Sequence, residues 1–521
     1  MGDQPPSSLT RTGLEPTRAE FEAVVAERDA AVAALAERDE RLAAMEAQVS
    51  VLTKQLTAVL GRVAELEAQA KRNSGNSDKP PSSDPPGQKP LRTNKPTGGK
   101  PGGQHGHEGR TNTPFAAEAT TPEPVIPTSC ERCGVGFASD VPTMGAPYLF
   151  QHIEIPPMPP LVVEFQLHER CCADCGGVTR GQLPADIGPS PYGPRLQALV
   201  ATWAVQFHLS RRQIQRLLAS LYGLALSTGT LQAIIERVAA ACEKPVGELK
   251  DAIAGAPFAN ADETGHAHQG GGAKGKRHWL WVAVTLWGAV FAAAADRGAE
   301  GMALVLGQEF DGIVGCDRWR AYESRFGERR QLCWAHLKRE GQAAVDRAGH
   351  LLASKNPKVR ACGKLLLTWG EAFLALYKAM FSTWHRFEAG ALTRAGLRGG
   401  MVSHQTAFGE LLQQGLQLED LNARRMCRDL LRPVQWKALW TFVTTPGVEP
   451  TNNLAEQALR QPVLLRRKTF GTRSENGMAA LATLLSVVET CRRQGRAVID
   501  YFEAAIRSQR LGHPPPSLVP A

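Results

Sequence analysis

The chain has 521 residues, a formal net charge of +9 and 43% hydrophobic residues. That length exceeds one hydrophobic core, so several structural units are expected, and the basic balance suits a polyanionic partner. Because the first residues, MGDQPPSSLTRTG, lack the apolar run of a secretory signal, we expect a cytoplasmic protein. The most apolar stretch, residues 278–295, contains Gly288 and many strand formers, so it favours a strand hairpin over contact with a membrane.

Residues 15–72 carry a heptad pattern that predicts a coiled-coil multimerisation helix. Arg28 and Arg38 interrupt the pattern, so its stronger section is 42–66. The alternative is an amphipathic helix folded against its own domain, but a linker follows and no partner helix precedes, which favours self-association. The two rows of apolar positions are Phe21, Leu35, Leu42, Val49, Leu56 and Val63, and Val24, Met45, Leu52, Val59 and Leu66.

Residues 73–127 are rich in proline, glycine, serine and lysine and contain few large apolar side chains. Such a segment buries too little surface to offset its ordering entropy, so it predicts a disordered basic linker.

Residues 128–190 contain two C-x2-C-G motifs, CERCG at 130–134 and CADCG at 172–176. Each is typical of a zinc knuckle, and two knuckles supply four thiolates for a closed tetrahedral Zn²⁺ site. A closed site is structural, since no coordination position stays open for substrate. Cys171 adds a fifth thiol, and the stretch between the motifs predicts two strands. The expected ligands are Cys130, Cys133, Cys172 and Cys175.

Residues 191–250 predict helices. One helix begins near Ser210 and ends at Tyr222–Gly223, and LSTGT then supplies cap residues for a second helix. Helix, short glycine-bearing turn and capped helix form the helix-turn-helix outline, although any helical hairpin gives the same pattern. The DNA-binding candidates here are Arg211, Arg212 and Arg216.

Residues 251–340 have a mixed α/β pattern. PFANADETG is a short apolar run ending at Asp262 and followed by a turn, and IVGCD is a second short strand ending at Asp317. Two strands ending in aspartates, with a hairpin and a helix between them, follow the order of a ribonuclease H-like core. Carboxylates at adjacent strand ends can share Mg²⁺, but strand-end aspartates are also common turn and cap residues.

A third carboxylate is expected from a helix beside the sheet, and Glu456 in TNNLAEQALR is the best candidate over Glu263 and Glu449. The helical residues 341–445 form an insertion that separates Asp317 from this glutamate. Residues 446–510 then complete the core, and 511–521 form a tail. In QLCWAHLKRE, Cys333 and His336 have C-x2-H spacing; metal binding is one interpretation, and packing near the active centre is the preferred one.

The combination resembles the insertion sequence sixty-six family of bacterial DDE transposases. The resemblance rests on the heptad helix, NSGNSDKPPSSD, the two knuckles, ADETG, CDRWRAY, CWAHLKRE and TNNLAEQALR followed by RRKTFGTRSENG. It implies that Asp262, Asp317 and Glu456 form the acidic triad, and that Cys333 and His336 are a signature near the active site. It also implies that the N-terminal half binds the terminal repeats and that accessory transposition proteins take part.

The function expected is therefore a DNA transposase that binds the element's inverted repeats and joins its ends to target DNA, near the nucleoid. Asp262 would bridge two Mg²⁺ or Mn²⁺ ions, with Asp317 and Glu456 completing one each. The alternatives are a catalytically inactive DNA-binding protein and a structure-specific nuclease on the same fold. Downstream basic residues are candidates for phosphate contact or for a solvated face: Arg460, Arg466, Arg467, Lys468 and Arg473.

Overall fold

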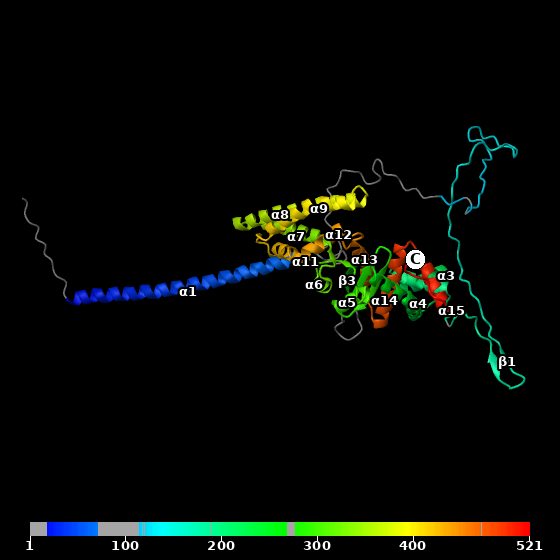
Figure 1. Cartoon of the computed structure of the whole chain (residues 1–521), viewed down its shortest axis with the longest axis horizontal. Coiled ribbons are helices and arrows are strands. Elements are labelled where there is room, and N and C mark those ends of the chain that lie inside the picture. The colour runs from blue at the N-terminus through cyan, green and yellow to red at the C-terminus, as the bar shows by residue number, and fades with distance from the viewer. Residues whose placement is uncertain are drawn as a thin grey trace, which may run out of the picture. The chain divides into compact units, whose positions relative to one another are not determined.

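The computed structural model describes residues 18–70, 114–116, 118, 120–188, 190–267, 277–469 and 471–520 (Figure 1). The chain divides into two units, Met1–Asn73 and Ser74–Ala521. Most of the predicted linker, residues 73–113, lies outside the described residues. No helix in the described part of the chain combines the length and apolar character needed to cross a membrane.

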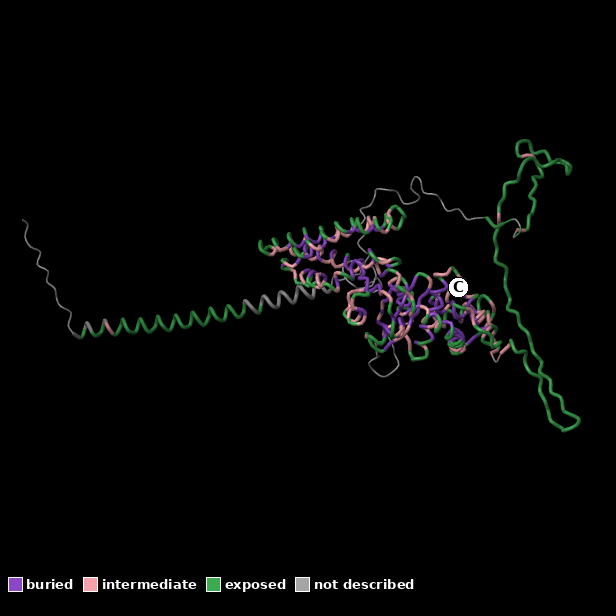
Figure 2. Tube along the Cα trace, in the orientation of Figure 1, coloured by how far each residue is buried: buried purple, intermediate pink, exposed green. Residues whose placement is uncertain are grey.

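The described residues of the first unit form a single helix, α1 (Arg18–Ala70), of 53 residues. A helix is thus confirmed where the heptad pattern predicted one. Leu35, Leu42, Met45, Val49 and Leu52 are at least half exposed, so this part of the apolar stripe is uncovered within the first unit (Figure 2). The side chains of the remaining heptad positions lie outside the described part. Multimerisation through α1 stays a prediction.

A five-stranded mixed sheet forms the centre of the second unit, in the order β5-β4-β3-β6-β7. β3, β4 and β5 pair antiparallel, whereas β6 and β7 extend the sheet in parallel from β3. The predicted hairpin is confirmed as β4 and β5, while β7 was not anticipated. The bounds are β3 (Phe258–Ala267), β4 (Arg277–Val284), β5 (Ala289–Ala294), β6 (Ile313–Cys316) and β7 (Arg330–Leu332).

The turn predicted directly after Asp262 is wrong. β3 continues through Ala267, because residues 260–267 pair with β4 in an unbroken antiparallel ladder. The apolar run of β4 is buried on both faces, with Leu280 through Val284 fully covered. Burial on both faces explains why this strand lacks the polar alternation of a half-exposed strand.

Helices from both ends of the second unit share one hydrophobic core with this sheet. α14 packs on β5 and α4, α13 packs on β3 and β4, and α5 packs on β4 and β5. These helices are α2 (Pro194–Val205), α3 (Arg211–Tyr222), α4 (Thr228–Ala254), α5 (Ala299–Leu306), α6 (Arg320–Phe326), α13 (Asn453–Thr469), α14 (Glu475–Arg493) and α15 (Val498–Leu511).

The predicted insertion is helical, as expected, and has a second core of its own (Figure 2). Large aromatic side chains fill it, among them Trp334, Trp369, Phe373 and Phe408, whose rings lie within 5.0–5.5 Å of a neighbouring ring. Its helices are α7 (Trp334–Leu352), α8 (Pro357–Glu388), α9 (Arg394–Gly415), α10 (Leu421–Leu430), α11 (Pro433–Leu439) and α12 (Thr441–Thr444).

The helix-turn-helix outline is formed by α3 and α4 at nearly the predicted boundaries. Ser210 caps α3 in a reciprocal capping box with Gln213, and Gly223 ends it in the left-handed region at φ 65°. Ser227 caps α4 by accepting a hydrogen bond from the Thr230 backbone. α4 buries one face in the main core along its length, while exposed residues such as Thr228, Glu236 and Glu243 lie on its other face.

Candidate functional site

Two aspartates occupy corresponding places on neighbouring strands because those strands pair in parallel. Asn260 on β3 lies opposite Gly315 on β6. Asp262 and Asp317 each follow that pair by two residues, on the same face as it, since side chains alternate along a strand. Both aspartates line a single cavity of about 930 Å³.

Glu456 reaches the same cavity from the first turn of α13. Ala455, Ala458 and Leu459 are buried against the sheet, which fixes the orientation of the helix and turns Glu456 toward the cavity. Just before α13, the Asn452 side-chain amide donates to the Ala261 carbonyl at 2.9 Å. This bond ties the start of α13 to the strand that carries Asp262. The structure therefore brings together all three acids that the sequence singled out.

Asp262 lies among like charges. Although the residue opens onto the cavity, burial raises the pKa of its carboxyl well above the usual range, and the neighbouring Glu263 and Asp317 raise it further. Burial and Asp317 also raise the pKa of Glu263. Arg297 and Tyr322 oppose that shift by donating to the Glu263 carboxylate at 2.6 and 2.8 Å. Glu263 is thus neutralised by its own partners, whereas Asp262 and Asp317 face the cavity as a crowded pair.

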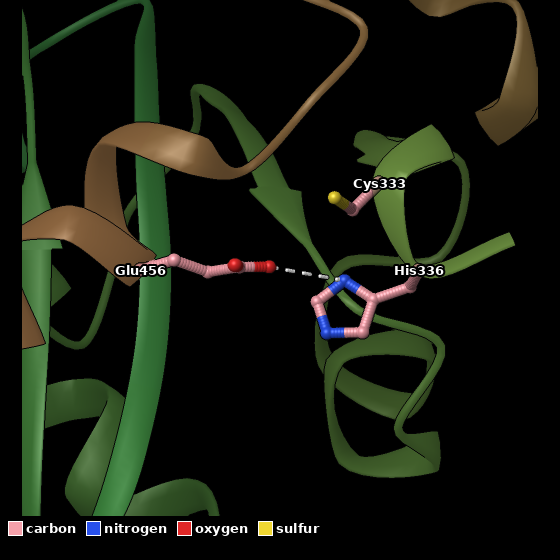
Figure 3. A group of neighbouring side chains, drawn as sticks. All are labelled: Cys333, His336 and Glu456. Atoms are coloured by element: carbon pink, nitrogen blue, oxygen red, sulfur yellow. Dashed lines mark ion pairs between the residues drawn. The ribbon is translucent and has the colours of Figure 1, made fainter. Parts of the chain in front are cut away.

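Glu456 is held by the insertion as well as by its own helix. Its Oε2 accepts from Arg339 at 2.7 Å, and its Oε1 lies 3.5 Å from His336 Nδ1 (Figure 3). Burial lowers the pKa of His336, but Cys333 and Glu456 outweigh that effect and raise it to about 10. Arg339 was missed by the sequence reasoning, although it stands one turn after His336 on α7 and shares its face.

The three acids do not make the tightest group of potential ligands. Among the described residues, ligand atoms within 4.8 Å of one another belong to Cys333, His336 and Glu456. The positive Arg339 attracts Glu456, while the like charges of Asp262 and Asp317 repel it. Electrostatics therefore favours the observed position of the glutamate, away from the aspartate pair.

Arginines border the acidic cavity. Arg460 and Arg467 are exposed, and they lie seven residues apart on one face of α13. Lys468 and Arg473 are also exposed. Arg466 instead turns to β3, where it donates to the Gly265 carbonyl and to Thr264 Oγ1. The lining arginines are Arg297, Arg318, Arg339, Arg460 and Arg467.

The arginines of the α3–α4 region also differ from one another. Arg212 and Arg216 are exposed on α3. Arg211 is largely covered, and its guanidinium donates to Gln232 Oε1 on α4 at 2.8 and 3.1 Å. Arg211 therefore links the two helices.

Each C-x2-C-G motif forms a tight turn. The Gly134 and Gly176 amides donate to the Cys130 and Cys172 carbonyls, with both glycines in the left-handed region. Hydrogen bonds from the second cysteine of each motif lower the pKa of Cys130 and Cys172. Within the described residues the four thiols do not gather into one group. The four-cysteine zinc site stays a prediction.

The strands expected between the motifs are wrong. Residues 141–168 contain no strand, and the two short strands β1 (Glu169–Cys171) and β2 (Val178–Arg180) are instead the arms of the second turn. The IEIPPMPPLVV segment contains four prolines, which have no amide hydrogen to donate and so interrupt the pairing of a strand.

Known families and a known protein match parts of this chain. Residues 4–113 match a family of unknown function (DUF6444). The uncharacterized protein y4qI of Sinorhizobium fredii (strain NBRC 101917 / NGR234) is 24% identical over 241 residues, which are 42% of this chain and 39% of that protein. The chain thus spans about two fifths of that relative's length. Residues 189–480, more than half of the chain and including all three acids, match the family described as Transposase IS66 family. The chain belongs to the IS66 family of transposases.

Proposed function

We propose that this chain cleaves DNA at the ends of a mobile element and joins them to target DNA, with Asp262, Asp317 and Glu456 as the catalytic acids. The observation that carries the proposal is that these three residues, separated widely along the sequence, line one cavity bordered by arginines. Membership of the transposase family supports the same reaction class.

The sheet order supports a ribonuclease H-like core. β5-β4-β3 form an antiparallel meander, and β6 and β7 add in parallel on the far side of β3. In such a core the first strand carries one acid and the fourth strand a second, here β3 and β6. α13 supplies the third acid after the helical insertion.

The acids fit divalent cations of the Mg²⁺ or Mn²⁺ class. Hard cations prefer carboxylate oxygens, and a cation would neutralise the charge on Asp262, whose pKa is raised first by burial and then by the neighbouring acids. Glu456 Oε1 is buried without a hydrogen-bond partner, so it has an unused acceptor position. Asp262, Asp317 and Glu456 would hold two such ions, which would stabilise the attacking and leaving oxygens of an in-line phosphoryl transfer.

The remaining residues of the cavity would position the DNA. Arg460 and Arg467 present positive charge to a phosphodiester entering the cavity, which aligns the backbone without reading sequence. Arg297 neutralises Glu263 and stacks over Trp319 with its guanidinium carbon 4.5 Å from the ring centroid. The ion pair with Arg297 balances the charge of Glu263, so Glu263 does not add a third unpaired carboxylate beside Asp262 and Asp317.

Other parts of the chain support an assembly on DNA. The exposed Arg212 and Arg216, beside the accessible start of α4, suit binding of the terminal inverted repeats. The uncovered stripe of α1 suits self-association, and the two cysteine turns suit structural Zn²⁺. Accessory transposition proteins and a place at the nucleoid belong to the same proposal.

A strand-transfer assay with labelled element ends tests it. Alanine at any of the three acids should reduce joining by at least about 100-fold, while end binding persists; the variants are Asp262→Ala, Asp317→Ala and Glu456→Ala. Loss of a residue that only supports a metal ligand costs up to about 100-fold, so loss of a ligand itself should cost at least that much. Asp311→Asn is the matched control, because Asp311 is fully exposed and pairs only with Arg329 among the described residues.

The other outcomes separate the rival functions. Full joining activity in Asp262→Ala would overturn the catalytic assignment. End binding without cleavage by the unaltered chain would indicate an inactive DNA-binding relative, and cleavage without joining would indicate a nuclease.

A further inference from the structure

Three different ligand types converge beside the proposed catalytic centre. The Cys333 thiol, the His336 ring and the Glu456 carboxylate point toward one another (Figure 3), and one ligand atom of each lies within 4.8 Å of the others. Cys333 precedes the first turn of α7 and His336 lies three residues later, which puts both on one face of that turn. Glu456 comes from α13, on the opposite wall.

Two atoms of this group are buried and lack hydrogen bonds. His336 Nδ1 and Glu456 Oε1 have no hydrogen-bond partner, although they face each other across 3.5 Å. A buried polar atom without a hydrogen bond loses the bonds that it would make to water, so such a pair calls for a physical explanation. A cation between the atoms would satisfy both.

The donor set distinguishes this group from the aspartate pair. A thiolate is a soft ligand and selects Zn²⁺-like ions, whereas Asp262 and Asp317 offer only hard oxygen atoms. Zinc binds sulfur at about 2.3 Å and nitrogen or oxygen at about 2.0–2.2 Å, which small side-chain movements from the present separations would reach. Arg339 adds one positive charge nearby, but a thiolate and a carboxylate together exceed it.

We propose that Cys333, His336 and Glu456 form a site for a thiophilic divalent cation of the Zn²⁺ class, with a fourth position open to water. Binding replaces the Cys333 thiol proton and one ring proton of the charged His336 with bonds to the metal, and it releases both protons to solvent. The site shares Glu456 with the proposed catalytic centre, and this consequence rests on the proposed function: Zn²⁺ held here withdraws the glutamate from the aspartate pair and inhibits strand transfer.

Metal stoichiometry tests the site without DNA. Full-length protein is dialysed against Zn²⁺ and its bound metal is measured for the unaltered chain, Cys333→Ser, His336→Asn and Glu456→Gln. The first two variants should each lose one equivalent, and Glu456→Gln should bind it more weakly. Cys362→Ser is the control, because Cys362 is a partly exposed thiol on α8 outside the group and should leave the stoichiometry unchanged.

Unchanged stoichiometry in folded Cys333→Ser or His336→Asn would overturn the site. The variants remove different ligands, so one that unfolds, as judged by thermal melting, leaves the others to decide. In a second arm, Zn²⁺ is added to Mg²⁺-supported strand transfer, and each variant is compared with its own uninhibited rate. Inhibition should be lost in Cys333→Ser and retained in Cys362→Ser. Equal inhibition of Cys333→Ser and Cys362→Ser would contradict the claim that Glu456 serves both sites. The catalytic role of the three acids would still be decided by the alanine variants.

Discussion

Asp262 and Asp317 each stand two residues beyond the paired Asn260 and Gly315, so parallel pairing of β3 with β6 sets the two aspartates at the same level of the sheet. The pairing brings two carboxylates together in the lining of one cavity, where burial and the neighbouring acids raise the pKa of Asp262. A protein that retains such a pair accepts a cost in stability, which is expected at a functional site rather than in a structural core.

Asp262→Asn should therefore stabilise the chain when divalent cations are omitted. The folded pKa of Asp262 is raised above its ordinary value of 3.8, so the folded state binds its proton more readily and loses stability as pH rises through that range. Asparagine keeps an acceptor for the Glu263 amide, which now donates to Asp262 Oδ1 at 2.9 Å, and removes the charge. Thermal unfolding should show a gain for the variant that grows as the pH rises above about 4, near the ordinary pKa of an aspartate carboxyl.

Added Mg²⁺ should reverse this order, because ligand binding to the folded state stabilises only the chain that retains the site. Asp311→Asn should follow the unaltered chain under both conditions. A variant that is less stable than the unaltered chain at high pH without metal would contradict the crowding of the pair.

Gly315→Ala should destabilise the pairing of β3 with β6 that positions Asp262 and Asp317. A Cβ atom at this position would meet Asn260 Oδ1 at 2.3 Å, which is too close unless the buried Asn260 side chain or one of the two strands moves. Overpacking of this kind typically costs about 1–3 kcal/mol, so the midpoint of denaturant unfolding should fall. Gly349→Ala is the control, since nothing lies within 4 Å of a Cβ there. Equal midpoints for the two variants would mean that Asn260 yields freely.

Local patterns in the sequence were sufficient for much of this architecture. Ser210, Gly223 and Ser227 marked the ends of α3 and the start of α4, because caps and left-handed glycines act within a few residues. The acids on β3, β6 and α13 were singled out because each follows or begins a recognisable element.

Contacts between segments that are distant in the sequence could not be predicted from such local patterns. The position of Arg339 opposite Glu456 depends on how the insertion folds back on the sheet, across 117 residues. The contacts of Arg211 with Gln232 and of Arg466 with β3 also depend on tertiary folding. The sequence alone does not distinguish an arginine that faces solvent from one that donates to a neighbouring oxygen. The extension of β3 past Asp262 likewise depended on its pairing with β4.

Arg339→Met should weaken the proposed reaction through Glu456. Arg339 holds Glu456 Oε2 at 2.7 Å, and both side chains are only 19% exposed, so the pair is poorly screened by solvent. Residues that orient a metal ligand typically contribute about 10–100-fold, and strand transfer should fall by that factor with a higher Mg²⁺ requirement. Arg339→Lys should recover part of the rate, because it keeps the charge. A loss that excess Mg²⁺ does not reduce in either variant would point to a structural defect instead.

Neutralising Arg467 and Lys468 should flatten the salt dependence of DNA binding. Both side chains are exposed near the end of α13, and Arg467 borders the acidic cavity, so a phosphate there would release counterions on binding. Each lost phosphate contact should reduce the slope of log affinity against log salt by about 0.9. Arg507→Gln is the matched control, because its charge already pairs with Glu503 at 2.7 Å. If the double variant keeps the slope of the unaltered chain, these two residues form a solvated face, and the phosphate path must be sought along Arg460 and Arg473.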